Sequence, residues 1–215
     1  MPSIFITGIG TDVGKTIVAA ILAEALEADY WKPVQAGNEN GTDSDFVRAN
    51  ISNSRTKIHP EAYLLGMAAS PHISAKEEGK KIGLDEIKRK LKKIEHQNDF
   101  LIIEGAGGLL VPLNEEEFVI DLISVLEAKV IIVSRNYLGS INHSLLTAKT
   151  LASKNISVMG WIFNDHYMDY EEEIACWSGI PKIASIPFEE NPDKRFILEQ
   201  AKWIRPQILK LLSID

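Results

Sequence analysis

The chain has 215 residues, of which 45% are hydrophobic, and this length and apolar content predict one α/β domain, over residues 1–215, with a large buried core. The formal net charge of −7 argues against a broad basic face for nucleic acid, no apolar run approaches the ~18 residues of a membrane span, and no secretory signal is evident, so a cytoplasmic protein is expected. The single cysteine, Cys176, excludes an internal disulfide and is expected to be a buried structural thiol.

The first predicted element is a short strand that leads into a phosphate-binding loop. An apolar run at residues 4–6 is followed closely by Gly-Ile-Gly-Thr-Asp-Val-Gly-Lys-Thr at residues 8–16. Glycines allow backbone N–H groups to close around phosphate oxygens, Lys15 adds a positive charge, and Thr16 offers a hydroxyl to Mg²⁺. Gly8 lies one residue earlier than the usual spacing requires, which indicates a loop longer by one residue. Apolar residues at helical spacing directly after the loop favour this interpretation over an ordinary strand-to-helix turn.

Apolar runs then alternate with helical patterns along the chain. Strands are predicted at residues 3–7, 30–32, 100–104, 130–134, 158–163 and 182–186. Helices are predicted at residues 15–28, 83–96, 117–128, 140–154, 168–178 and 192–212, with a break at Pro206. Residues 34–80 are poorer in strand signals and are expected to form short helices and loops. Because several strands are almost wholly apolar, the pattern predicts an α/β fold with a doubly wound, mostly parallel sheet, in a three-layer sandwich like that of P-loop NTPases.

Polar residues end three of these strands, at the edge where ligands of open parallel sheets bind. Lys32 ends the second strand, Glu104 with three glycines ends the third, and Asn164 ends the fifth. A lysine next to the phosphate loop would reach a transferred phosphoryl group, although a lysine between a strand and a proline is often a surface residue. Glu104 could hold Mg²⁺ beside the phosphates, or be a solvated acid at the end of a strand.

Three further features are weaker candidates. Asp45 could be a second magnesium ligand or a helix cap, and Asp43 is the more cap-like of the two. Ser70 and Pro71 resemble a helix start, with the serine as cap and the proline at the first position. Another helix opens after Gly139, and N–H groups at residues 139–141 could bind a carboxylate.

Taken together and in their order along the chain, the motifs resemble those of the dethiobiotin synthetase family. The matching segments lie at residues 7–16, 32–37, 44–45, 70–72, 104–108, 138–143 and 160–165. They follow the family's order over about residues 3–188, and the family's longer phosphate loop accounts for the displaced Gly8. Each motif by itself is modest, but the ordered set is specific.

The resemblance implies a homodimeric, ATP- and Mg²⁺-dependent ligase of biotin biosynthesis, with no nucleic-acid or membrane partner. Such an enzyme condenses 7,8-diaminononanoate with CO₂ to dethiobiotin. One amine captures CO₂ as an N-carbamate, the carbamate attacks the γ-phosphorus to give a carbamic–phosphoric anhydride, and the second amine closes the ring as phosphate leaves. Because negative charge accumulates on phosphoryl oxygens, two lysines and Mg²⁺ are the expected catalysts.

The site residues are implied by their positions in these motifs. The implied catalytic set is Lys15, Lys32 and Thr11, and the implied metal set is Thr16, Asp45 and Glu104. The implied nucleotide contacts are Asp12, Val13, Gly14, Lys15, Thr16, Ile17, Glu104, Gly107, Gly108 and, at adenine, Asn164. The implied substrate contacts are Lys32, Ala36, Ser70, Pro71, Leu138, Gly139, Ser140 and Asn142. Among these, the helix start after Gly139 resembles the one that receives the substrate carboxylate across the dimer interface.

Two departures from the family pattern affect the expected contacts. Ala36 stands where the family often has a small hydroxyl residue, so a hydrogen bond to substrate is missing or is supplied by Gln35. The resemblance fades after Phe188, in the region expected to shape the base pocket.

Two other classes of protein are compatible with a phosphate loop. A switch ATPase of the partitioning type, which binds partner proteins or membrane, typically has an extra lysine early in the loop, and residues 8–14 contain none. A small-molecule phosphotransferase commonly brings several arginines over the phosphates, and here no arginine lies in a phosphate motif. The ligase is therefore the leading interpretation.

Overall fold

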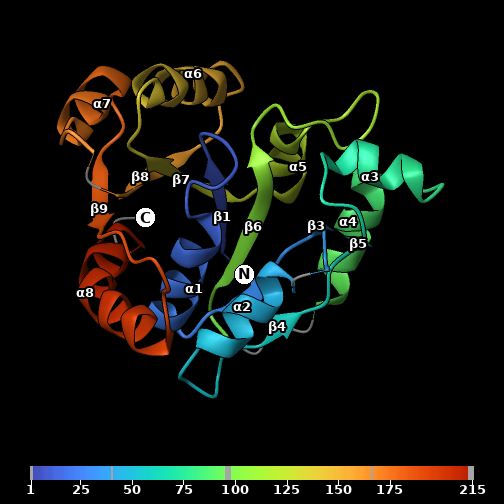
Figure 1. Cartoon of the computed structure of the whole chain (residues 1–215), viewed down its shortest axis with the longest axis horizontal. Coiled ribbons are helices and arrows are strands. Elements are labelled where there is room, and N and C mark those ends of the chain that lie inside the picture. The colour runs from blue at the N-terminus through green and yellow to red at the C-terminus, as the bar shows by residue number, and fades with distance from the viewer. Residues whose placement is uncertain (1, 40, 95–97, 166, 213–215) are drawn as a thin grey trace.

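The computed structural model describes residues 2–39, 41–94, 98–165 and 167–212. Its main feature is a seven-stranded sheet of order β4-β2-β6-β1-β7-β8-β9 (Figure 1). These strands are β1 (Ser3–Gly8), β2 (Asp29–Trp31), β4 (Ile58–His59), β6 (Leu101–Gly108), β7 (Lys129–Arg135), β8 (Val158–Asn164) and β9 (Lys182–Ile186). All described pairings in this sheet are parallel, which confirms the predicted doubly wound fold.

Helices cover both faces of the sheet and give three layers (Figure 1). One face is covered by α1 (Lys15–Leu26), α2 (Asp43–Asn50) and α8 (Lys194–Leu212). The other is covered by α4 (Leu84–Lys93), α5 (Val119–Leu126), α6 (Ser140–Ser153) and α7 (Glu171–Ser178), with α3 (Pro71–Glu77) near the carboxyl edge. Along β1, Ile4 and Ile6 enter the first core and Phe5 the second, as the period of two requires. Burial of both faces is the reason that most residues of these strands are apolar.

The prediction for residues 34–80 was only partly right. Besides α2 and α3, this segment contains β3 (Val34–Ala36) and β5 (Tyr63–Leu65), which form a separate two-stranded parallel sheet, and β4, which extends the main sheet beside β2. Strands of two or three residues are too short to show a period-two pattern in the sequence. β3 also contacts β6, so this segment packs against the strand that carries Glu104.

Three local predictions were wrong. The third strand was predicted to end at residue 104, but β6 continues through Gly108, and a side chain at Gly105 would come within 2.7 Å of Phe5. Helix α8 continues through Pro206. Pro206 lies on the exposed side of the helix, and the residues around it that face the core, Ile204 and Ile208, stay buried. Cys176 is exposed, because Ile174 is the residue of α7 that faces the core. The predicted helix end at residues 95–96 lies outside the described residues.

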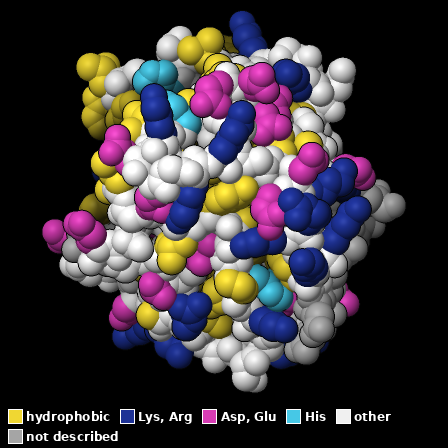
Figure 2. Space-filling view, turned by 90° about the vertical axis from the view of Figure 1, so that its right-hand side faces the viewer, with side chains coloured by type: hydrophobic (Ala, Val, Ile, Leu, Met, Phe, Trp, Pro, Cys, Tyr) yellow, Lys and Arg dark blue, Asp and Glu magenta, His cyan; other side chains and the backbone are white. Residues whose placement is uncertain are grey.

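The side of the molecule that carries α3 and α4 is charged with both signs (Figure 2). Lysine and arginine side chains there alternate with acidic ones, and ion pairs join Lys80 to Glu78 and Arg89 to Glu86. The buried residues of α4 face the core, so its charged residues form a solvated outer face. In the described part of the chain, no helix combines the length and the apolar character needed to cross a bilayer.

Candidate active site

The phosphate loop connects β1 to α1 and requires glycine at two positions. Gly14 has a φ of 91°, and a side chain on it would lie 2.2 Å from the amide nitrogen of Asn164. A side chain on Gly8 would lie 2.6 Å from Val13. The N–H of Ile9 donates to the carbonyl of Val133 at 3.1 Å, which fixes the start of the loop over β7. The loop therefore packs tightly against the ends of β7 and β8.

A cavity of about 780 Å³ opens beside this loop, at the carboxyl edge of the sheet. Its lining includes the predicted site residues Thr11, Asp12, Gly14, Lys15, Thr16, Ile17, Lys32, Ala36, Ser70, Pro71, Glu104, Gly107 and Asn164. It also includes residues that were not assigned to the site from the sequence, among them Val34, Asp43, Ala68, Ala69, Ala106, Val111, Arg135, Pro187, Phe188, Glu189, Glu190, Pro192 and Phe196. Lys15, Lys32 and Glu104, which are remote in the chain, thus line one cavity.

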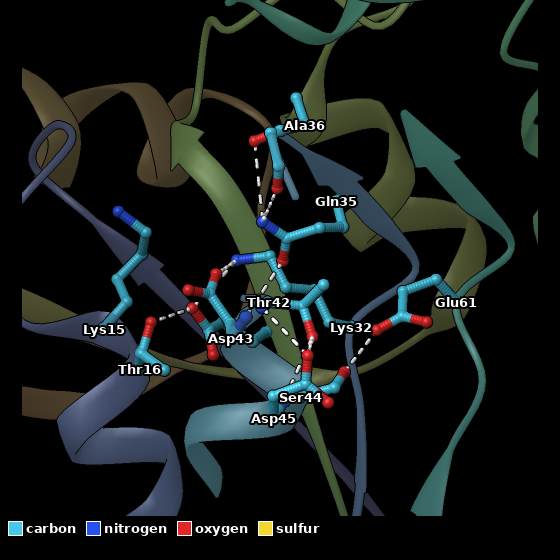
Figure 3. Close-up of polar contacts among 12 residues, drawn as sticks. Lys15, Thr16, Lys32, Gln35, Ala36, Thr42, Asp43, Ser44, Asp45 and Glu61 are labelled. Atoms are coloured by element: carbon cyan, nitrogen blue, oxygen red, sulfur yellow. Dashed lines mark hydrogen bonds and ion pairs between the residues drawn. The ribbon is translucent and has the colours of Figure 1, made fainter. Parts of the chain in front are cut away.

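Lys32 is buried between two carboxylates (Figure 3). Its Nζ lies 3.0 Å from Oε1 of Glu104 and makes a second ion pair with Oδ2 of Asp43. Burial alone would lower the pKa of Lys32, but the carboxylates of Glu104 and Asp43 outweigh it and raise this pKa above its ordinary value. Lys32 is therefore charged at neutral pH and is not a surface residue, since it is 5% exposed.

Glu104 joins three elements of the fold. Its Oε1 accepts a hydrogen bond from Oγ1 of Thr16 at 2.8 Å, and its Oε2 accepts one from the hydroxyl of Tyr30 at 2.7 Å. Burial, and then the charge of Glu104, raise the pKa of Tyr30 well above its ordinary value, so the phenol stays protonated. With 1% exposure, Glu104 is a desolvated carboxylate held by α1, β2 and β6 rather than a solvated acid.

Lys15 is folded back onto its own loop. Its Nζ donates to the carbonyl of Gly10 at 2.7 Å, and the side chain lies apart from the pair formed by Lys32 and Asp43 (Figure 3). Burial lowers the pKa of Lys15 to about 8, although the charge of Glu104 opposes this shift. An anion bound beside Lys15 would favour its charged form and raise this pKa again.

Asp45, rather than Asp43, caps helix α2 with its side chain. Asp45 forms a capping box at the start of α2, where its Oδ2 accepts from the N–H of Thr42 at 3.1 Å and from the Thr42 hydroxyl at 2.8 Å. Its Oδ1 is paired with Arg48 at 2.6 Å. Asp43, the residue predicted to be cap-like, instead lines the cavity beside Lys32. Asp45 thus takes one of the two roles considered for it, that of a helix cap, and its place in the metal set stays a prediction.

The residues predicted to bind the substrate carboxylate lie outside this cavity. Leu138, Gly139, Ser140 and Asn142 are at the start of α6, and neither they nor Val13 and Gly108 line it. The N–H of Ser140 donates to the carbonyl of Tyr137 at 2.9 Å, and its buried hydroxyl lies 2.7 Å from that of Tyr170. These groups are therefore engaged within the chain. A separate groove of about 310 Å³, lined in part by Thr11, Gly108 and His143, lies between the phosphate loop and α6.

Gln35 does not offer a free amide to the cavity. Its Nε2 donates to the carbonyl of Gly37 at 3.0 Å, and its Oε1 accepts from the N–H of Asp43 at 3.3 Å. Gln35 thus ties β3 to the start of α2 and helps to hold Asp43 near Lys32. The side chain of Ala36 has no polar group, so it cannot supply the hydrogen bond to substrate that Gln35 was considered for.

The donor set around Glu104 fits a magnesium ion. Mg²⁺ prefers oxygen ligands and is usually bound by one or two protein groups together with water and nucleotide phosphates. The hydroxyl of Thr16 and Oε1 of Glu104, 2.8 Å apart, supply such oxygens. No cluster of three or more His, Cys, Asp or Glu side chains among the described residues could hold a metal ion. The site therefore fits an ion that shares its ligands with a nucleotide.

Two residues of the cavity lining that were not predicted from the sequence are Arg135 and Phe188. Arg135 ends β7, pairs with Asp165 at 3.2 Å and lies 5.7 Å from the centre of the Phe188 ring. The amide of Asn164 donates to the carbonyl of Val13 at 3.3 Å. Arg135 follows the same strand-end rule that singled out Lys32, so that signal was available, whereas no local signal marked Phe188.

Comparisons with known proteins relate the chain to curated relatives by sequence and to solved structures by fold. A protein-family model described as an AAA domain matches residues 2–194. The chain is 52% identical over 202 residues to the ATP-dependent dethiobiotin synthetase BioD of Cytophaga hutchinsonii, covering 94% of this chain and 96% of that protein. It is 44% identical over 210 residues to the protein of the same name from Christiangramia forsetii, covering 97% and 99%.

The similar solved structures include a plasmid partition protein and a cell division ATPase. A plasmid partition protein of Borrelia burgdorferi has a TM-score of 0.64 at 16% identity and covers 97% of this chain and 98% of that one. The cell division ATPase MinD of Pyrococcus furiosus has a TM-score of 0.59 at 16% identity, with 98% and 100% covered. At this identity the likeness shows a shared P-loop fold and nothing further.

Proposed function

Since the chain belongs to the dethiobiotin synthetase family, we propose that it is an ATP-dependent ring-closing ligase of biotin biosynthesis, made of one domain over residues 1–215. Its substrates are 7,8-diaminononanoate, CO₂ and ATP, and its product is dethiobiotin. The observation that carries the proposal is the meeting of Lys15, Lys32 and Glu104 in one cavity beside the phosphate loop.

The proposed reaction has three steps. One amine of the diamine adds to CO₂ and loses a proton, which gives an N-carbamate. A carbamate oxygen attacks the γ-phosphorus of ATP, ADP leaves, and a carbamic–phosphoric anhydride forms. The second amine attacks the anhydride carbon and loses a proton, phosphate leaves, and the ureido ring closes. No step needs a nucleophile from the protein.

The two lysines stabilise the charge that develops on the transferred phosphoryl group. Lys32 is held in its charged form by Glu104 and Asp43, so its ammonium is preorganised before substrate binds. Lys15 leaves the carbonyl of Gly10 and turns to the phosphates when the nucleotide is present. Thr11 completes this set from the loop itself.

Magnesium is proposed to neutralise phosphate charge and to orient the phosphates for in-line attack. Thr16, at the start of α1, and Glu104, on β6, would hold it, because their side-chain oxygens lie 2.8 Å apart. Asp43 is a further carboxylate that lines the same cavity and is ion-paired with Lys32. Asp45 would have to give up its capping-box contacts to join the set.

The rest of the cavity divides between base and substrate. We assign the base to the region of Asn164, Arg135 and Phe188, because these residues lie beyond the loop at the ends of β7 and β8 and after β9. Ser70 and Pro71, which begin α3, line the cavity with Ala36 and are assigned to the diamine. The start of α6 lies outside this cavity, so its predicted contact with the substrate carboxylate requires the second subunit of a homodimer.

The test is product formation by the purified protein. Incubation with the diamine, bicarbonate, Mg²⁺ and ATP is expected to give dethiobiotin, detected by mass, with one ADP released per product. A folded protein that makes no dethiobiotin would refute the ligase. ATP turnover driven by lipid or DNA and unaffected by the diamine would favour a partitioning-type ATPase instead.

A further inference from the structure

Tyr30 carries a phenol hydroxyl into the sheet, where the strand itself requires only an apolar side chain. It lies on β2 opposite Ile102 of β6, and its side chain is fully buried. A buried tyrosine hydroxyl must find a hydrogen-bond partner to avoid a loss of stability. Here the partner is Oε2 of Glu104, at 2.7 Å. The contact therefore links the core to the cavity.

The two carboxylate oxygens of Glu104 face different groups. Oε1 accepts from Thr16 at 2.8 Å and from Lys32 at 3.0 Å, both of which line the cavity. Oε2 accepts from Tyr30, and Glu104 is only 1% exposed, so water competes little for this oxygen. The last torsion of a glutamate is broad and nearly two-fold, and a buried donor on one oxygen restricts it. Tyr30 thereby leaves Oε1 turned toward Thr16.

We infer that Tyr30 is a positioning residue, which fixes the Glu104 carboxylate so that Oε1 is available to a magnesium ion together with Thr16. The inference rests on the proposed function in one respect, the assignment of Glu104 to the metal. Partners that orient a metal ligand typically contribute 10–100-fold to metal affinity. A merely structural tyrosine would affect the stability of the fold and leave the response to Mg²⁺ unchanged.

The test is the variant Tyr30→Phe, which removes the hydroxyl and keeps the ring. Binding of fluorescent ADP to the full-length chain is titrated in EDTA and then across a Mg²⁺ series, without the diamine. The half-saturating Mg²⁺ concentration is expected to rise at least about 10-fold. The affinity for metal-free ADP is expected to stay within about twofold, because the glycine loop and Lys15 remain intact. The matched control is Tyr63→Phe, which removes a hydroxyl that accepts from the N–H of Gly83 outside the cavity and should leave the Mg²⁺ response unchanged.

Two results from the single variant would overturn the inference. One is an unchanged Mg²⁺ response in Tyr30→Phe, and the other is the loss of its cooperative thermal melt, which would make the hydroxyl a determinant of folding. A double variant gives an independent check. Because Tyr30 acts through Glu104, adding Tyr30→Phe to Glu104→Gln should change the half-saturating Mg²⁺ concentration by less than about twofold, and an additive change would contradict this route. If the parent protein makes no dethiobiotin but its ADP binding depends on Mg²⁺ and Tyr30→Phe weakens that dependence, the ligase is refuted and the role of Tyr30 stands.

Discussion

Replacing Lys32 tests whether its buried ammonium acts mainly in the transition state. In Lys32→Ala, the carboxylates of Glu104 and Asp43 lose their shared cation. In the variant, Glu104 keeps its hydrogen bonds from Thr16 and Tyr30. Because Glu104 is only 1% exposed, water cannot replace the lost ammonium as a partner for its charge. Breaking a buried pair in this way costs about 3–5 kcal/mol of unfolding free energy. Urea unfolding at pH 7 measures this loss.

The expected catalytic effect is larger than the effect on nucleotide binding. Removal of one preorganised charge from an oxyanion typically lowers kcat by about 10²–10³-fold. The phosphate loop and Lys15 still hold the ground-state phosphates, so the Kd of ATP should rise by no more than about threefold. Lys32→Met, which retains most of the side-chain volume, separates the loss of charge from the loss of packing.

The assay combines steady-state formation of dethiobiotin with direct binding of ATP. Lys182→Met is the control. Lys182 lies outside the cavity lining and pairs with Glu171 at a distance of 3.3 Å, so this variant should leave kcat unchanged. Equal losses in kcat and in ATP affinity would assign Lys32 to ground-state binding. A loss of less than about 1 kcal/mol in the free energy of unfolding would refute the view that the buried ion pair of Lys32 with Glu104 is strong.

The remaining predictions concern other parts of the cavity. The pKa of Lys15 is lowered to about 8 without nucleotide, so ADP affinity should fall by up to about tenfold per pH unit above pH 8, and ADP binding should take up a proton. Calorimetry in buffers of different ionisation heat measures this proton uptake. Zero proton uptake at about pH 8.5 would contradict the lowered pKa. Glu104→Gln should raise the Mg²⁺ concentration needed for half-maximal turnover, and an unchanged titration would remove Glu104 from the metal set. Asp45→Ala should lower the melting temperature through loss of the capping box and leave the Mg²⁺ requirement unchanged, whereas a raised requirement would show that Asp45 leaves its cap when nucleotide binds. Asn164→Ala should raise the Kd of ATP more than that of inorganic tripolyphosphate, measured by competition, if the amide faces the base.

Much of the fold is encoded locally and was therefore predictable. The apolar runs of β1, β7 and β8 must be buried on both faces, and this alone indicates a parallel sheet under two layers of helices. The strands of residues 34–80 were missed because each has two or three residues, and their pairing depends on partners elsewhere in the chain.

The site was predictable where chemistry follows a strand end or a glycine turn. Lys15 and Thr16 belong to a contiguous motif. Lys32 follows β2 and Glu104 lies midway along β6, and the carboxyl ends of these parallel strands meet at one edge. Arg135 obeys the same rule and was available to it. Asp43 and Asp45 are two residues apart on one helix, and their sequence context did not distinguish the cap from the residue that lines the cavity.

The sequence by itself determined the phosphate loop, the parallel sheet and the edge at which the charged groups lie, because each depends on backbone geometry or on burial of a short run. Only the tertiary structure decided how these groups pair. The contacts of Glu104 with Thr16, Tyr30 and Lys32 join residues 72 to 88 positions apart, and their hydrogen-bond geometry is set by packing between β2, β6 and α1. Such contacts depend on side-chain torsions and local desolvation, and no pattern along the chain records either.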